Sequence, residues 1–313
     1  MRVFVAGGTG AVGRFLLPLL IEDGHDVVAL VRTSQKGKTV EALGAKAVIA
    51  DARNSKELTQ AVVQTEPEVI IHQLTSIPGA VNFKRFDEEF ALTNRFRTEA
   101  TDTLLTAARL AGARRFIAQS FCGWPFAREG GPVKTEEDAL DPHPPASFRH
   151  TLAAIRYLED AIRQAEDVPA LALRYGFFYG PGTSIASDGS VVELVRRRRL
   201  PIVGNGGGVW SFIHIEDAAR ATVAAISQGA PGIYNIVDDE PAPVSAWLPT
   251  LARAVGAKPP YRVPGWLGRL AIGDGGVSMM TQIRGGSNAK ARRELAWQPS
   301  YASWRRGFVE GLG

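Results

Sequence analysis

The chain has 313 residues, of which 45% are hydrophobic and 22% charged, with a formal net charge of +4 and a pI near 9.3. This size supports one large α/β domain or two smaller ones. The modest positive charge, without any motif that joins aromatic and basic residues, argues against nucleic acid as a partner. The single cysteine, Cys122, excludes an internal disulfide and a cysteine metal cage. We expect a cytoplasmic globular protein with a small-molecule ligand and no bound metal.

The first residues have a strand pattern rather than that of a cleavable signal, and no apolar run approaches the about 20 residues of a membrane span. After the apolar run Arg2 to Ala6 comes the loop Gly7-Gly8-Thr9-Gly10-Ala11-Val12-Gly13, and then apolar residues at helical spacing. A glycine turn between a strand and a helix brings backbone N–H groups to a pyrophosphate. We expect a dinucleotide to contact Gly7, Thr9, Gly10, Ala11, Val12 and Gly13.

Strand and helix patterns alternate through the first half of the chain, which predicts a doubly wound parallel sheet of about seven strands, of Rossmann type. Further strands are expected at Asp26 to Val31, Ala47 to Ala50, Glu68 to Gln73, Arg115 to Gln119, Ala170 to Arg174 and Gly232 to Val237. Helices are expected at Ser55 to Gln64, Phe86 to Ala111, Thr151 to Ala165, Asp217 to Ser227 and Tyr301 to Leu312. We expect residues 1–174, with about 209–238, to bind NAD(P), and residues 175–208 and 239–313 to form a smaller substrate lobe.

Two charged residues follow the second and third expected strands. Arg32 stands where an NAD-binding fold places an acid on the ribose hydroxyls, and a cation there favours the extra phosphate of NADP. The alternative is a solvated arginine in a loop, and NAD is then the cofactor. Asp51 is placed either to accept a hydrogen bond from the adenine amino group or to cap the helix that begins near Ser55.

Several segments together resemble the extended short-chain dehydrogenase/reductase family, also called NAD-dependent epimerase/dehydratases. They are the glycine loop, Asp51, the strand that ends at Ser120, Leu173 to Gly182, and Ser211 to Ala219. The resemblance implies a Rossmann lobe with a small substrate lobe, carbonyl or nucleotide-sugar substrates, and homodimers through the two long helices of the first lobe. It also implies that Gly7, Gly10 and Gly13 hold the pyrophosphate, Arg32 the adenosine, Asp51 and Ala52 the adenine, Leu74 and Thr75 the ribose, and Ser120 the reacting oxygen.

The chain departs from this family at the catalytic pair. The family uses a tyrosine as acid or base and a lysine four residues later, and no tyrosine of this sequence has a lysine at that distance. Aligning Glu159 with the glutamate that commonly follows the lysine places Thr151 at the tyrosine position and Ile155 at the lysine position. Thr151 is too weak an acid to replace a phenol, and Ser120 alone is a hydrogen-bond donor rather than a proton source.

Three residues are weighed as substitutes for the missing acid. His150 titrates near neutrality but stands at a helix start, where histidine is often solvent-exposed. Tyr175, expected in a loop, is a phenol near the ligand edge, although tyrosine there is more often a packing residue. Lys134 either swings over the site or belongs to a solvated loop.

Other conspicuous residues have simpler interpretations. Arg196 to Arg199 end a helix, His214 and Asp217 fix a helix and the lobe interface, and Cys122 is a small buried group. Trp124 and Phe126 are expected to wall an apolar pocket.

The sequence therefore favours an NADP-dependent oxidoreductase or epimerase with a non-standard proton donor. The alternatives are a non-catalytic redox sensor that binds NADP, and a lyase or isomerase that uses the dinucleotide structurally.

Overall fold

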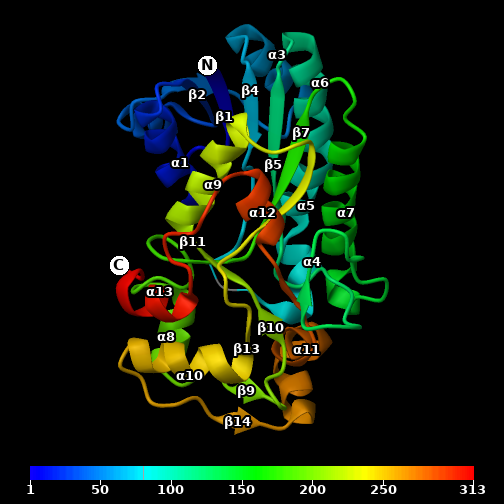
Figure 1. Ribbon diagram of the computed structural model, residues 1–313, viewed down its shortest axis with the longest axis vertical. Helices are drawn as coiled ribbons and strands as arrows, with labels where there is room; N and C mark the ends of the chain where they lie inside the picture. The colour runs from blue at the N-terminus through cyan, green and yellow to red at the C-terminus, as the bar shows by residue number, and fades with distance from the viewer. Residues whose placement is uncertain (80) are drawn as a thin grey trace.

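The computed structural model describes residues 1–79 and 81–313. Seven parallel strands form its central sheet in the order β12-β7-β5-β4-β1-β2-β3 (Figure 1). They are β1 Arg2–Ala6, β2 Asp26–Val31, β3 Lys46–Ile49, β4 Val69–His72, β5 Arg115–Phe121, β7 Ala170–Tyr175 and β12 Gly232–Ile236. The predicted doubly wound sheet is confirmed, including the last strand, β12, which pairs with β7.

Helices cover both faces of the sheet. On one face pack α1 Ala11–Glu22, α2 Ser34–Glu41 and α9 Ile215–Ser227. On the other pack α3 Ser55–Thr65, α6 Thr101–Ala111 and α7 Arg149–Arg163. The pleat sorts the side chains of β7 between these layers, because Leu171 and Leu173 lie on the α1 and α9 side and Ala170 and Ala172 on the α6 and α7 side.

The long helix expected from Phe86 to Ala111 is broken into shorter pieces. A 3₁₀ turn, η1 Phe83–Arg85, precedes α4 Phe86–Glu89 and α5 Ala91–Arg95, and a π-helical segment, η2 Phe96–Ala100, leads into α6. Single π turns inside helices often mark functional sites. This one carries Arg97, a charged side chain that is only 6% exposed.

The remaining elements lie mostly below the sheet in Figure 1. Short strands pair as β8 Phe177–Tyr179 with β11 Phe212–His214, β9 Ile202–Val203 with β14 Arg262–Val263, β10 Val209–Trp210 with β13 Ala242–Pro243, and β6 Val133–Lys134 with β15 Gly285–Gly286. The helices are η3 Ala146–Phe148, α8 Ser190–Arg196, α10 Val244–Ala254, α11 Gly265–Thr281, α12 Ala289–Glu294 and α13 Trp304–Glu310.

A third buried cluster joins these lower elements to the sheet domain. From the side of the sheet domain it contains Phe86, Trp124, Phe148 and Ile155. From the lower elements it contains Trp210, Phe212, Trp247 and Trp304. The ring centroids of Phe86 and Phe148 are 4.4 Å apart, and those of Trp124 and Phe148 are 4.8 Å apart. Trp124 and Phe126, expected to wall an apolar pocket, are themselves buried.

Candidate functional site

The glycine loop between β1 and α1 has the backbone geometry of a phosphate cradle. Gly7 has a φ of 106°, and a Cβ there would lie 2.5 Å from the carbonyl oxygen of Gln73. A Cβ on Gly13 would collide with the carbonyl oxygen of Gly8. Helix α1 starts at Ala11 without a side-chain cap, so the N–H groups of its first turn are left for an anion. These residues fit a dinucleotide pyrophosphate.

The adenosine end of the expected site carries two arginines. Arg32 follows β2 and is exposed, and its charge helps to lower the pKa of Asp51. The main cause of that lowering, to about 2, is Arg53, whose Nη2 lies 2.6 Å from Asp51 Oδ2. The sequence analysis did not single out Arg53. Its place two residues after Asp51, just past a strand end, could have indicated that the two side chains pair.

Asp51 is not the cap of α3. The side chain of Asn54 accepts the N–H groups of Lys56 and Glu57 instead. The other expected neighbours of the nucleotide lie at the carboxyl ends of β3 and β4, with Ala52 buried and Leu74 and Thr75 half-buried.

Ser120 lies within a buried ion-pair network. Its Oγ donates a 2.7 Å hydrogen bond to Glu159 Oε1 of α7. The same carboxylate receives Nε and Nη2 of Arg174 at 2.6 Å each, and the side chains of Arg174 and Glu159 are 1% and 0% exposed. Ser120 and Arg174 lie on the α7 side of the sheet, so in this state the hydroxyl of Ser120 is committed to Glu159.

Thr151, the residue expected at the family's tyrosine position, lies in a second polar cluster. Thr151 Oγ1 donates to Asp87 Oδ1 at 2.7 Å and accepts from Asn94 Nδ2 at 3.0 Å. Asp87 also accepts the backbone N–H groups of His150 and Thr151 and so caps α7 from a distant segment. Ile155, one turn later, is fully buried in the aromatic cluster. This edge of α7 therefore presents a threonine and an isoleucine.

The three substitutes for the acid are held differently. His150 is exposed. Tyr175 lies in β7 rather than in a loop, and its buried hydroxyl contacts Gln73 Nε2 and Thr222 Oγ1 at 2.9 and 2.6 Å. Burial raises the pKa of Tyr175 to about 12, which disfavours its ionised form. Lys134 is buried in β6 and pairs with Asp138 at 3.1 Å.

The structural interpretations of three further motifs are confirmed. His214 caps α9 and contacts the carbonyl of Gly311 through Nε2, and Asp217 accepts the N–H groups of Ser300 and Tyr301. Cys122 is fully buried, and burial raises the pKa of its thiol. Arg196 ends α8.

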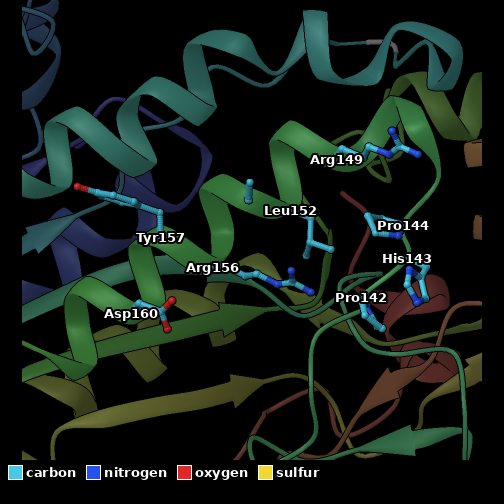
Figure 2. A pocket seen from close by; sticks show the side chains of 9 residues that line it. Pro142, His143, Pro144, Arg149, Leu152, Arg156, Tyr157 and Asp160 are labelled. Carbon is cyan, nitrogen blue, oxygen red and sulfur yellow. The ribbon is translucent and has the colours of Figure 1, made fainter.

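Two hollows flank the outer face of α7. One, of about 680 Å³, lies between α7 and the loop at residues 142–144 and is lined by Arg149, Arg156, Tyr157 and Asp160 among others (Figure 2). The second, of about 560 Å³, lies between α6 and α7 and shares Tyr157 and Asp160. Neither contains an expected catalytic or cofactor residue.

The described residues show neither a metal-binding cluster nor a helix suited to cross a membrane. No group of three or more histidine, cysteine, aspartate or glutamate side chains in residues 1–79 and 81–313 is arranged to hold a metal ion. Across the same residues, no helix has the length and apolar character needed to cross a membrane.

The glycine cradle at the edge of a doubly wound sheet defines a dinucleotide-binding α/β protein of Rossmann type. Residues 3–237 match the model of the family described as "NAD dependent epimerase/dehydratase family". A 3-diazoavenalumate denitrifying reductase from a Streptomyces species is 41% identical over 315 residues, which cover 98% of this chain and 99% of the relative. The chain therefore belongs to the NAD-dependent epimerase/dehydratase family, the extended short-chain dehydrogenases/reductases, for which NAD(P) is the typical cofactor.

More distant similarities extend to a ketoreductase by sequence and to two solved structures by fold. A 4-hydroxy-2-methyl-3-oxo-4-farnesyl-3,4-dihydroquinoline-1-oxide ketoreductase from Stigmatella aurantiaca is 27% identical over 82% of this chain and 74% of the relative. UDP-glucose 4-epimerase from Thermotoga maritima has a TM-score of 0.75 at 21% identity, covering 100% of this chain and 97% of that structure. The human epimerase family protein SDR39U1, solved with NADPH, has a TM-score of 0.77 at 18% identity, covering 100% and 99%.

Proposed function

We propose that this protein is an NADPH-dependent reductase whose substrate accepts a hydride without needing a proton from a side chain. The observation that carries the proposal is the pair Thr151 and Ile155, with the Thr151 hydroxyl donated to Asp87. In our alignment, no phenol stands at the position of the family's acid, and no lysine stands four residues later. Ser120 and Tyr175 do not restore the function, because both hydroxyls are buried in hydrogen bonds with protein groups.

The substrate class follows from charge balance. A ketone that accepts a hydride becomes an alkoxide and must take up a proton to give the alcohol. An arenediazonium ion that accepts a hydride forms an aryl C–H bond and breaks its C–N bond, releasing N₂, and no proton is consumed. When bound, the reduced dinucleotide supplies that hydride. The 41% identical relative is named for the denitrifying reduction of a diazo compound, so we propose an aryl diazonium substrate here.

This chain's own residues would position such a substrate. Trp124, Phe86 and Phe148 form a contiguous aromatic cluster on the side of α7 that carries Leu152 and Ile155. Aromatic rings pack favourably against an aryl group. Asp87, beside Thr151, places a carboxylate at this edge, although its oxygens already accept three hydrogen bonds.

The test follows reduced-dinucleotide oxidation and product mass with 4-hydroxybenzenediazonium and, in parallel, acetophenone. With NADPH deuterated at the transferred position, we expect phenol that carries one deuterium on its ring, at a rate above that of the mixture without protein. In D₂O with ordinary NADPH, the new C–H position should carry no deuterium. Reduction of acetophenone alone would contradict the proposal and favour a carbonyl reductase with a non-standard proton donor. Binding of NADPH with no turnover of either substrate would favour a non-catalytic sensor.

The cofactor preference is proposed from Arg32 and Arg53, which flank Asp51 and leave one excess positive charge at the adenosine end. Guanidinium groups bind phosphate in a forked geometry. We expect Arg32→Gln to weaken NADPH binding by about tenfold to a hundredfold and to leave NADH binding nearly unchanged, as measured by nucleotide fluorescence. Equal losses for both nucleotides would contradict the assignment. The matched control is Lys36→Gln, an exposed residue in the first helical turn of α2.

Homodimerisation through α6 and α7 and a cytoplasmic location also remain proposals. The two hollows along α7 share Tyr157 and Asp160, so this face of the helix is concave. Side chains of a second copy would fill these hollows. Sedimentation of the purified chain tests the dimer.

A further inference from the structure

The π-helical segment Phe96–Ala100 places a cation in the protein interior. Arg97 is 6% exposed, and desolvation lowers its pKa to about 10. In the described part of the chain it forms no ion pair with a carboxylate, and its Nη1 is buried without a hydrogen-bond acceptor. A buried cation without a counter-ion costs several kcal/mol. An anionic ligand would supply such a partner.

The segment that carries Arg97 is held against the end of β4. The carbonyl of Phe96, the preceding residue, contacts His72 Nε2 at 3.1 Å, and burial and the charge of Arg97 both lower the pKa of His72. Asn94, three residues earlier on the same face, donates to Thr151 at the edge where the family's tyrosine would stand. The segment that carries Arg97 therefore lies between the carboxyl end of β4 and α7, at the edge where open α/β sheets bind their ligands.

The two buried glutamates of this region are engaged by other groups. Glu159 is occupied by the two-pronged pair with Arg174. Glu136 accepts the N–H of Asn235 at 2.7 Å. Nη1 of Arg174 is also buried without an acceptor, so two guanidinium groups have a nitrogen left over.

We propose that Arg97 is the anion-binding residue of the substrate site and that its ligand is the carboxylate of an aromatic acid. We infer that the ligand is aromatic because the rings of Phe86, Trp124 and Phe148 cluster on the same edge of α7. The pyrophosphate of the dinucleotide belongs to the cradle at Gly7 to Gly13, so it does not satisfy Arg97. The inference rests on the proposed function, because it describes the substrate of that same site.

The experiment measures binding, so it does not depend on turnover. Calorimetry with the NADPH-loaded protein compares trans-cinnamate with its neutral isostere trans-cinnamamide. We expect the wild type to prefer the carboxylate by about tenfold to a hundredfold and Arg97→Gln to lose that preference while keeping its affinity for NADPH. The matched control is Arg95→Gln, an exposed arginine two residues away that pairs with Glu99 at 2.6 Å.

Thermal unfolding provides the second readout. Because removal of an uncompensated buried cation relieves desolvation, Arg97→Met should unfold at the same or a higher temperature than the wild type. A lower melting temperature for Arg97→Met together with an unchanged preference for cinnamate in Arg97→Gln would overturn the proposal and leave a structural role. Loss of NADPH affinity in Arg97→Gln, with the carboxylate preference intact, would overturn it by assigning Arg97 to the nucleotide. A wild type that does not distinguish cinnamate from cinnamamide would also overturn it, whether or not a diazonium substrate is reduced.

Discussion

At the scale of single residues, burial decides what the polar groups of this protein can do. Ser120, Glu159 and Arg174 form a network in which both carboxylate oxygens have a donor. Within the described residues, Arg97 has no carboxylate paired with it, and its Nη1 is buried without an acceptor. The contrast separates a guanidinium paired with a carboxylate from one that we propose to bind a ligand.

The pair between Arg174 and Glu159 gives a prediction for stability. Glu159→Gln leaves the guanidinium of Arg174 buried without a counter-charge, so the free energy of unfolding should fall by about 3–5 kcal/mol. Urea denaturation followed by circular dichroism measures it. The control is Glu193→Gln, which breaks an exposed pair with Arg197 and should cost about 1 kcal/mol or less. Equal losses in the two variants would contradict this account.

The limits of sequence reasoning are clearest at this scale. Ser120 was correctly placed near the carboxyl end of its strand, and Tyr175 lies at the end of β7 rather than in the expected loop. The sequence did not state which of these hydroxyls would find protein partners. That outcome depends on residues far along the chain, Glu159 for one and Thr222 for the other. Arg97 carried a usable signal, because with Thr101 and Leu104 it continues one buried stripe of the helix, where a charged residue is unexpected.

At the scale of elements, the strands were predictable because buried parallel strands are short, apolar and bounded by turn residues. β2 has the expected bounds, and β12 ends one residue early. The helix from Phe86 to Ala111 was wrong as a single piece, because apolar periodicity does not register the extra residue of a π turn. Helix α7 begins two residues earlier than expected, at Arg149, since its cap comes from Asp87 on another element.

The distant cap gives a prediction for α7. Asp87→Ala removes acceptors from the N–H groups of His150 and Thr151 and from the hydroxyl of Thr151, so unfolding should become easier by about 2 kcal/mol. Chemical denaturation compares it with Glu88→Ala, whose exposed pair with Arg85 should contribute about 0.5 kcal/mol. If Glu88→Ala costs as much as Asp87→Ala, the capping role is excluded.

At the scale of the whole molecule, a buried histidine links stability to pH. Burial lowers the pKa of His72 from 6.5 to about 4. In the neutral ring, Nε2 contacts the carbonyl of Phe96 and Nδ1 accepts the N–H of Leu74, so a second proton would have no acceptor. The unfolded chain binds that proton more tightly, and His72 therefore favours the folded state above about pH 6.5.

This stabilisation is lost as the pH falls from about 6.5 toward 4, and its full size is about 3 kcal/mol. Denaturation curves collected between pH 7.5 and 4.5 should show a smaller decline for His72→Gln than for the wild type. Carboxylates contribute to the decline in both proteins, so the difference between the two curves isolates the histidine. Parallel curves would contradict the assignment.

The clasp between Asp217 and the backbone of Ser300 and Tyr301 has a consequence for biosynthesis. Asp217 is fully buried in α9, a helix that covers one face of the central sheet, yet its backbone partners lie 83 and 84 residues further along the chain. Until those residues have been synthesised, the buried carboxylate lacks these two donors. The layer that covers this face of the sheet is therefore completed only after residues far beyond α9 have been made, even though most strands of the sheet come earlier.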